Sequence, residues 1–484
     1  MTHQDSPSLF DRALSNISAN WREVAVSAAR TVGLPVSDEA VADAARLQER
    51  MRDCLEARGG EVSARLRAAA LGRSYLQLDA EGRAVFLRVL ARDFAVKDEQ
   101  VEAAIDDYHQ QEDEEGRIGA TLRLREALEP PRIRLLRQFN ALPEGVKFLV
   151  DMRVDLAGLL DQDPQLRALD RDLQELLMSW FDTGFLDLRR ITWDSSAALL
   201  EKLIAYEAVH EIQSWDDLRD RLDSDRRCYA LFHPRMPNEP LAFVEVALVE
   251  GMARSVQVLL DESAPASDPA RADTAIFYSI SNTQRGLRGV TFGDFLIKMV
   301  VRELSHDLPQ IRNFATLSPV PGFRRWLNKL DAAALETLLT ADERSSVRKL
   351  SGLDDPSAGL GALLERDRWH EHKETKEALE EPMLRLAARY FMERREDGRP
   401  IDPVARFHLR NGARLERINW LGDTSLNGMQ QSAGVMVNYR YLIDDIEKNH
   451  EAFVTKGTVA ASSEVRSLMR RAEGGGALRR FGFV

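Results

Sequence analysis

A strand, a glycine-bearing turn, a helix and a second strand follow one another between residues 275 and 323. Ala275–Ile280 is apolar and aromatic, which is typical of a buried strand. From Asp294 onward the apolar residues recur at helical spacing, and Pro309 ends this predicted helix. Phe314–Leu317 then predicts the second strand. This order indicates a mixed α/β domain in the second half of the chain.

The turn between the first strand and the helix has the composition of an anion-binding loop. Arg285 and Arg288 could add positive charge, and the glycines at 286, 289 and 293 allow close approach of a ligand to the backbone. Unpaired N–H groups at a helix start favour a phosphate. An ordinary glycine-containing turn would have the same residues, so both interpretations stay open here. The spacing matches neither G-x-G-x-x-G nor a P-loop, so a Rossmann or Walker site is not supported.

The nearest known pattern is the pyrophosphate-binding turn of GNAT-type acyl-CoA enzymes, R/Q-x-x-G-x-G/A. The chain resembles it from Arg288 to Gly293, with Thr291 in place of the first glycine, which makes the turn less open. The resemblance implies that the pyrophosphate of CoA is bound by Arg288, Gly289, Val290, Thr291, Phe292, Gly293 and Asp294.

Length and charge limit the classes of protein to consider. A chain of 484 residues predicts two or three domains. The net charge of −12, from 66 basic and 78 acidic residues, argues against nucleic acid as a main partner. Cys54 and Cys228 form neither a disulfide framework nor a zinc pattern. No apolar run is long enough for a membrane span and the first residues do not resemble a secretory signal, so we expect a cytoplasmic protein.

The fold class predicted from these patterns is α+β. Residues 1–190 read as helix throughout and predict an all-helical N-terminal bundle. Residues 191–484 predict a GNAT-like mixed α/β domain, with a helical insertion at about 324–400. The expected strands outside the central segment are Cys228–Phe232, Leu241–Val249, Ser255–Leu260, Arg414–Trp420 and Val435–Tyr441.

His408 is the first candidate for chemistry. Asp402 is a suitable N-cap, Pro403 suits the first helical position and Gly412 suits the end, so His408 is placed in the last turn of a short helix. At that position the helix dipole would favour the imidazolium. The alternative is a histidine that packs beside Phe407 with a local hydrogen bond.

Ser318 is the second candidate, because it follows the second central strand and ligands gather at strand ends of open α/β sheets. The alternative is a turn serine that bonds its own backbone. The G-x-S-x-G motif of α/β-hydrolases is absent. His370 and His372 would point to different sides of a helix, so no metal site is predicted. Asn438 and Tyr441, on the last strand, are weaker candidates.

Several blocks in this order resemble the malonyl-CoA decarboxylase family. They are FHPRMPNEPLAFVEVAL, FYSISNTQRGLRGVTFG, LSPVPGF, FHLRNGA and NYRY, which span residues 230–445. The resemblance implies a helical N-terminal domain, a GNAT-type catalytic domain and assembly into a homo-oligomer, a dimer or tetramer. It also implies conversion of malonyl-CoA to acetyl-CoA and carbon dioxide without a metal or an organic cofactor; CoA is part of the substrate.

The same resemblance assigns residues. Ser318 and His408 match the catalytic pair of the family, and Tyr441 matches a supporting tyrosine. Thr291 stands where animal members carry a glutamate. The working hypothesis is that Ser318 hydrogen-bonds the malonyl carboxylate or the thioester oxygen, while His408 protonates the carbanion. Two other functions stay open: a GNAT-type acyltransferase that uses an amine acceptor, and a malonyl-CoA sensor without turnover.

Overall fold

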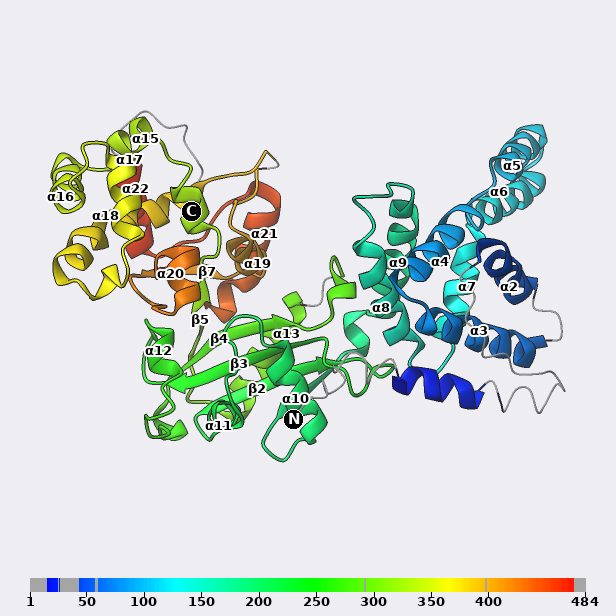
Figure 1. Ribbon diagram of the computed structural model, residues 1–484, viewed down its shortest axis with the longest axis horizontal. Helices are drawn as coiled ribbons and strands as arrows, with labels where there is room; N and C mark the ends of the chain where they lie inside the picture. Colours follow the sequence, from blue (N-terminus) through cyan, green and yellow to red (C-terminus); the bar gives the residue numbers. More distant parts are fainter. Residues whose placement is uncertain are drawn as a thin grey trace, which may run out of the picture. The chain divides into compact units, whose positions relative to one another are not determined.

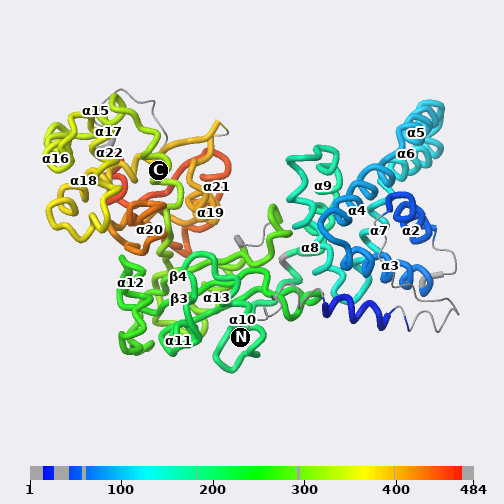
Figure 2. Tube along the Cα trace, viewed as in Figure 1, coloured from blue at the N-terminus to red at the C-terminus, as the bar shows by residue number. Residues whose placement is uncertain are grey.

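The computed structural model describes residues 15–24, 26, 43–56, 60–290, 293–396 and 398–473. The chain divides into two compact units. Figures 1 and 2 show the chain coloured by residue number, from blue at the N-terminus to red at the C-terminus. The first unit consists of Met1–Asp187 with two short later segments, Phe232–Leu241 and Thr283–Phe292. The second unit contains the remaining residues.

The first unit is a bundle of helices, as the sequence predicts. Its helices are α2 (Ala44–Glu56), α3 (Gly60–Gln77), α4 (Ala80–Arg92), α5 (Asp98–Gln110), α6 (Glu114–Leu128), α7 (Pro131–Asn140), α8 (Gly145–Ala157) and α9 (Leu166–Trp180). Figure 1 shows α5 and α6 as a hairpin. Aromatic rings fill the core, where Trp21 meets Phe148 edge-on with ring centroids 4.6 Å apart. Local signals set the boundaries: Asp79 caps α4 through the Gly82 N–H, at 2.8 Å.

The second unit is built on one mixed sheet. Its strands are β1 (Asp187–Ile191), β2 (Arg226–Phe232), β3 (Ala242–Val249), β4 (Thr274–Asn282), β5 (Asn313–Thr316), β6 (Ser318–Pro319), β7 (Arg414–Asn419) and β8 (Met436–Tyr441). The strand order is β1-β2-β3-β4-β5-β8-β6, and β7 also pairs with β8. The predicted α+β class is confirmed.

The central strand–helix–strand segment is also confirmed. Helix α13 (Gly293–Asp307) connects β4 to β5, and these two strands are parallel, with Phe277 opposite Thr316. The neighbouring pairs β3–β4 and β5–β8 are antiparallel. The carboxyl ends of β4 and β5 therefore lie at the same edge of the sheet, next to β6.

One predicted strand is wrong. Ser255–Leu260 contains the short helix α12 (Val256–Leu259). Val256 and Leu259 are buried while Val258 is 72% exposed, a three-residue spacing that belongs to a helical turn. In so short an apolar run, strand and helix periods are hard to separate.

The second unit also contains helices outside the sheet. Those before α13, besides α12, are α10 (Ala197–Tyr206) and α11 (Trp215–Asp220). The helical insertion comprises α14 (Phe323–Leu327), α15 (Ala332–Leu338), α16 (Ala341–Ser351), α17 (Pro356–Leu364) and α18 (Lys373–Met392). It is followed by α19 (Pro403–Arg410), α20 (Leu426–Ser432), α21 (Ile446–Lys456) and α22 (Ser463–Glu473).

Candidate functional site

Ser318 begins β6, where it lies opposite Val437 of β8. Its side chain is buried, with 5% exposure, and its Oγ donates a hydrogen bond to Thr316 Oγ1 at 2.8 Å. Thr316 Oγ1 also accepts from the Tyr439 N–H at 3.2 Å. Groups of two other strands, β5 and β8, thus hold the serine and fix the position of its oxygen.

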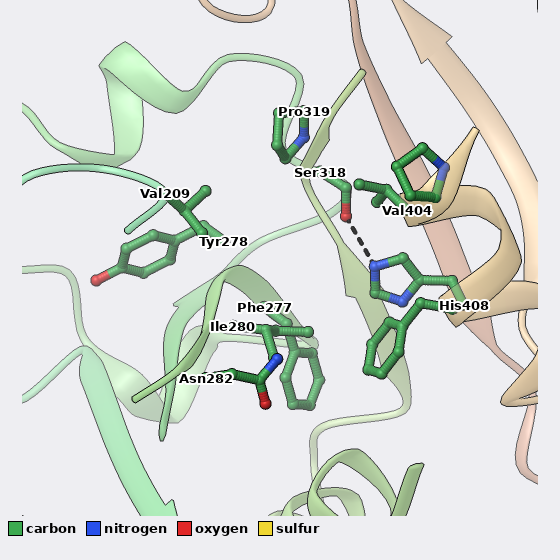
Figure 3. A pocket seen from close by; sticks show the side chains of 11 residues that line it. Val209, Phe277, Tyr278, Ile280, Asn282, Ser318, Pro319, Val404 and His408 are labelled. Atoms are coloured by element: carbon green, nitrogen blue, oxygen red, sulfur yellow. Dashed lines mark hydrogen bonds between the residues drawn. The ribbon is translucent and has the colours of Figure 1, made fainter. Parts of the chain in front are cut away.

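His408 lies in the last turn of α19, as the sequence predicts. Asp402 caps this helix through the Ala405 N–H at 2.7 Å, and Pro403 occupies the first turn. His408 is 3% exposed. Its Nε2 lies 3.2 Å from Ser318 Oγ, although the two residues are 90 positions apart in the sequence. The structure therefore brings together the two residues that the sequence singled out, as Figure 3 shows.

The hydrogen bonds around His408 run in one direction. Because Ser318 gives its only hydroxyl hydrogen to Thr316, it can only accept from His408 Nε2, which must then carry a hydrogen. In the neutral ring Nδ1 is then an acceptor, and the Tyr441 hydroxyl donates to it at 2.8 Å. The resulting chain runs from Tyr441 through His408 and Ser318 to Thr316.

The prediction that the helix dipole favours the imidazolium is wrong. Burial lowers the pKa of His408 from 6.5 to about 3, so the ring is neutral near pH 7. The dipole contributes only about 0.3–1 kcal/mol at an exposed position. The polar partners of the ring are neutral hydroxyl groups, so no carboxylate offsets the loss of hydration.

Two further tyrosines fix the helix and the ring of His408. The Tyr439 ring stacks on His408, with centroids 4.6 Å apart and an angle of 25° between the planes. The Tyr390 hydroxyl donates to the buried Asp402 carboxylate at 3.1 Å. A Cβ built on Gly322, in the turn after Ser318, would lie 2.1 Å from that hydroxyl oxygen. Tyr390 therefore touches both the cap of α19 and the turn that follows the serine.

A pocket of about 280 Å³ opens beside Ser318 and His408, at the carboxyl end of β4. Figure 3 shows the serine and the histidine on one side, with β4 residues on the other. Its remaining lining residues, mostly apolar, are Val209, Phe277, Tyr278, Ile280, Asn282, Pro319, Pro403, Val404 and Phe407. The site thus combines a small number of polar groups with walls that hydrate a charge poorly.

The wall around Val209 is held by a buried carboxylate. Glu207 accepts from the backbone N–H groups of Val209, at 2.8 Å, and His210, at 2.9 Å. The same carboxylate accepts from the hydroxyls of Ser279 at 2.7 Å and Ser281 at 3.0 Å, both on β4. These bonds join the loop to the strand, so the pocket has a fixed shape on this side.

The predicted CoA turn falls where the two units divide. Arg288, Gly289 and Val290 belong to the first unit, and Gly293 and Asp294 begin α13 in the second. Thr291 and Phe292 lie outside the described residues. The roles of these seven residues in binding therefore stay predictions.

Some contributors to the site had no local sequence signal. Tyr441 was a weaker candidate on the last strand and was assigned a supporting role through the family resemblance, whereas Thr316, Tyr390 and Tyr439 were not predicted. Thr316 and Tyr439 each lie two residues from a candidate, a spacing that places strand side chains on one face. Asn438, a weaker candidate, is fully buried and donates to the Thr316 carbonyl at 2.7 Å, so it supports the strand rather than lining the pocket.

Two kinds of feature are absent from the described residues. In this part of the chain, no three His, Cys, Asp or Glu side chains are grouped in a way that could hold a metal. Within the same ranges, no helix combines the length and the apolar character needed to cross a bilayer.

Comparison with known proteins supplies the family. The sequence model of the malonyl-CoA decarboxylase C-terminal domain matches residues 184–477, and that of the N-terminal domain matches residues 94–181. Malonyl-CoA decarboxylase, mitochondrial, from Anser anser anser is 39% identical over 419 residues, which are 83% of each chain.

Solved structures give the same result. The crystal structure of malonyl-CoA decarboxylase from Rhodopseudomonas palustris is 44% identical, has a TM-score of 0.78 and covers 88% of this chain and 99% of its own. The corresponding structure from Agrobacterium vitis is 44% identical, has a TM-score of 0.79 and covers 87% of this chain and 99% of its own. The chain belongs to the malonyl-CoA decarboxylase family.

Proposed function

We propose that this protein converts malonyl-CoA to acetyl-CoA and carbon dioxide, with Ser318 and His408 as the catalytic residues. The observation that carries the proposal is the hydrogen-bonded chain from Tyr441 to Thr316 at the wall of an apolar pocket. In the reaction the bond between the carboxylate carbon and the α-carbon breaks. Its electron pair forms the enolate of the thioester, and a proton then binds the α-carbon.

The apolar walls suit the first half of this reaction. A carboxylate in such a pocket loses hydration, while the carbon dioxide that leaves is neutral, so the surroundings disfavour the charge at that carbon. The charge moves to the thioester oxygen, which needs a hydrogen-bond donor. Ser318 can provide one to the malonyl carboxylate or the thioester oxygen by turning its hydroxyl away from Thr316.

His408 suits the second half as a neutral donor. Its Nε2 hydrogen passes to the α-carbon while the Tyr441 hydroxyl hydrogen passes to Nδ1, so the imidazole stays neutral throughout. Tyr441 regains a proton from solvent. The enolate of a thioester is a far stronger base than a phenolate, so this transfer is downhill. Burial lowers the pKa of His408 to about 3, which favours the neutral ring as the starting form of the proton donor.

The remaining expectations belong to the same proposal. CoA is part of the substrate, its pyrophosphate binds the turn from Arg288 to Asp294, and the reaction uses no metal or organic cofactor. Assembly into a dimer or tetramer and a cytoplasmic location stay predictions; the goose relative is named as mitochondrial.

Product analysis distinguishes the proposed reaction from its two alternatives. The purified protein is incubated with malonyl-CoA without an amine, thioesters are separated by chromatography and carbon dioxide is trapped. We expect acetyl-CoA and carbon dioxide in equal amounts. Free CoA that is released only after an amine is added would instead indicate an acyltransferase. Binding of malonyl-CoA without any product would indicate a sensor.

A further inference from the structure

The segment from Thr283 to Val290, which leads into the predicted CoA turn, folds against helices of the first unit. Gln284 donates to the Pro240 carbonyl at 3.0 Å, and the Thr283 hydroxyl donates to the same oxygen. A Cβ built on Gly286 would lie 1.9 Å from the Val150 carbonyl oxygen of α8, so only glycine fits there. The segment therefore has a defined conformation, with the short 3-10 turn η3 (Arg285–Leu287) at its centre.

Arg153 of α8 holds this segment through its backbone. Its Nη1 donates to the carbonyl oxygens of Gly286 and Arg288, at 2.8 Å each. Its Nε donates to Asp170 of α9 at 2.8 Å, and the arginine side chain is only 8% exposed. A buried guanidinium with a carboxylate partner has few conformations available, so it fixes the direction of both carbonyl groups.

Those carbonyl directions determine where the next N–H groups point. In a trans peptide the C=O of one residue and the N–H of the next point in opposite directions. Because the Arg288 carbonyl faces Arg153, the Gly289 N–H points away from it, and it has no partner among the described residues. Gly289 has a φ of +88°, which favours glycine.

The outer side of the same segment carries unpaired positive charge. Arg285 and Arg288 are exposed, and neither forms an ion pair within the described residues. The segment thus has a backbone N–H without a partner among the described residues and two exposed arginine residues, while Arg153 binds two of its carbonyl oxygens. This arrangement matches the needs of a pyrophosphate, which carries one negative charge on each of its two phosphates.

We propose that Arg153, with Asp170, is a positioning residue for the segment from Arg285 to Gly289, which binds a phosphate of CoA. Arg153 does not contact the substrate; it orients the Gly289 N–H and the chain that carries Arg285 and Arg288. This inference rests on the proposed function, because it takes CoA as the ligand of the turn.

The test compares ligands with and without the pyrophosphate. Affinity for CoA is measured by calorimetry, and kcat/KM is measured for malonyl-CoA and for malonyl-pantetheine, which lacks the nucleotide. Arg153→Met should weaken CoA binding about tenfold or more, because the Gly289 N–H is then no longer held in one orientation before the ligand binds. Turnover of malonyl-pantetheine should change less than about twofold. Arg153→Lys should fall between the wild type and Arg153→Met.

The matched control is Arg132→Met. Arg132 is also buried in the helical unit, pairs with Asp172 at 2.6 Å and donates to the Ala91 carbonyl at 2.7 Å. Among the described residues, it forms no hydrogen bond or ion pair with the segment from 283 to 290. Any loss of stability in the bundle should resemble that of Arg153→Met, yet CoA affinity should stay within about twofold of the wild type. If Arg153→Met does not fold, the exposed Arg288→Ala, with the same expected loss for CoA, replaces it.

Each outcome is decisive. Equal losses for malonyl-CoA and malonyl-pantetheine, or unchanged CoA affinity, would overturn the role of Arg153. If the replacement Arg288→Ala binds CoA as the wild type does, the proposal fails as well. A wild-type protein that binds CoA but does not decarboxylate malonyl-CoA would refute the proposed function alone, since CoA affinity still tests the turn. A wild type that does not bind CoA would overturn both.

Discussion

Tyr441→Phe removes one hydroxyl from the chain that ends at Ser318 and Thr316. The hydroxyl lies 2.8 Å from His408 Nδ1, and its loss leaves this buried nitrogen without its donor. An unsatisfied buried acceptor costs about 1–3 kcal/mol. If this cost is added to the activation free energy of the proton transfer, kcat falls about 5- to 150-fold, because about 1.4 kcal/mol corresponds to a factor of ten. The substitution also removes the hydrogen that would replace the one leaving Nε2.

The assay follows acetyl-CoA formation and gives kcat and KM separately. We expect KM for malonyl-CoA to stay within about twofold, because Tyr441 does not line the pocket. Tyr439→Phe is the matched control: this tyrosine lies two residues earlier on β8, and its buried hydroxyl has no partner among the described residues. Its ring keeps its stacking on His408, so kcat should change less than about threefold. Equal losses of kcat in both variants, or no loss of kcat in Tyr441→Phe, would refute the hydrogen-bonded chain that runs from Tyr441 through His408 to Ser318.

Three further predictions concern pH and packing. The pKa of His408 is about 3 in the folded protein and 6.5 ordinarily, so as the pH falls the unfolded chain takes up a proton first and the free energy of unfolding decreases between pH 6.5 and 3. Urea titrations of His408→Gln should show a smaller decrease over this range, and an equal decrease would contradict the burial argument. Gly322→Ala places a methyl group against the Tyr390 hydroxyl and should destabilise the protein by about 1–3 kcal/mol, and by less in a Tyr390→Phe background. If thermal melts show that the effects of the two substitutions simply add, the contact is refuted. Asn438→Ala removes hydrogen bonds to the carbonyls of Thr316 at 2.7 Å and Ala253 at 3.1 Å, and should lower the urea midpoint by an amount equivalent to about 2–4 kcal/mol; an unchanged midpoint would contradict this.

Local chemistry explains which features the sequence could predict. Asp79 and Asp402 cap helices by accepting hydrogen bonds from the backbone N–H groups three positions ahead, so a few neighbouring residues are enough to predict the caps. The strand–helix–strand order of β4, α13 and β5 was predicted from the change in the spacing of apolar residues. The run from Ser255 to Leu260 was too short for the period to decide, and its helix was missed.

Features that depend on distant contacts could not be predicted in this way. The pKa of His408 depends on how completely β8 and β6 enclose it, which no short stretch reveals. Tyr390 touches Gly322, 68 positions earlier in the chain, and nothing near either residue indicates the contact. The pairing of Ser318 with His408 was inferred from a family resemblance; the hydrogen bond itself comes from the fold.

The most direct test of the catalytic pair measures kcat for Ser318→Ala, His408→Ala and the double variant, together with their affinity for CoA. We expect each single variant to lose at least about a hundredfold in kcat, with CoA affinity within about threefold of the wild type. The double variant should lose little more than either single one, since the two residues act as a unit. His306→Ala, at an exposed histidine of α13, should match the wild type. Retained turnover in His408→Ala, or losses that multiply in the double variant, would contradict the account.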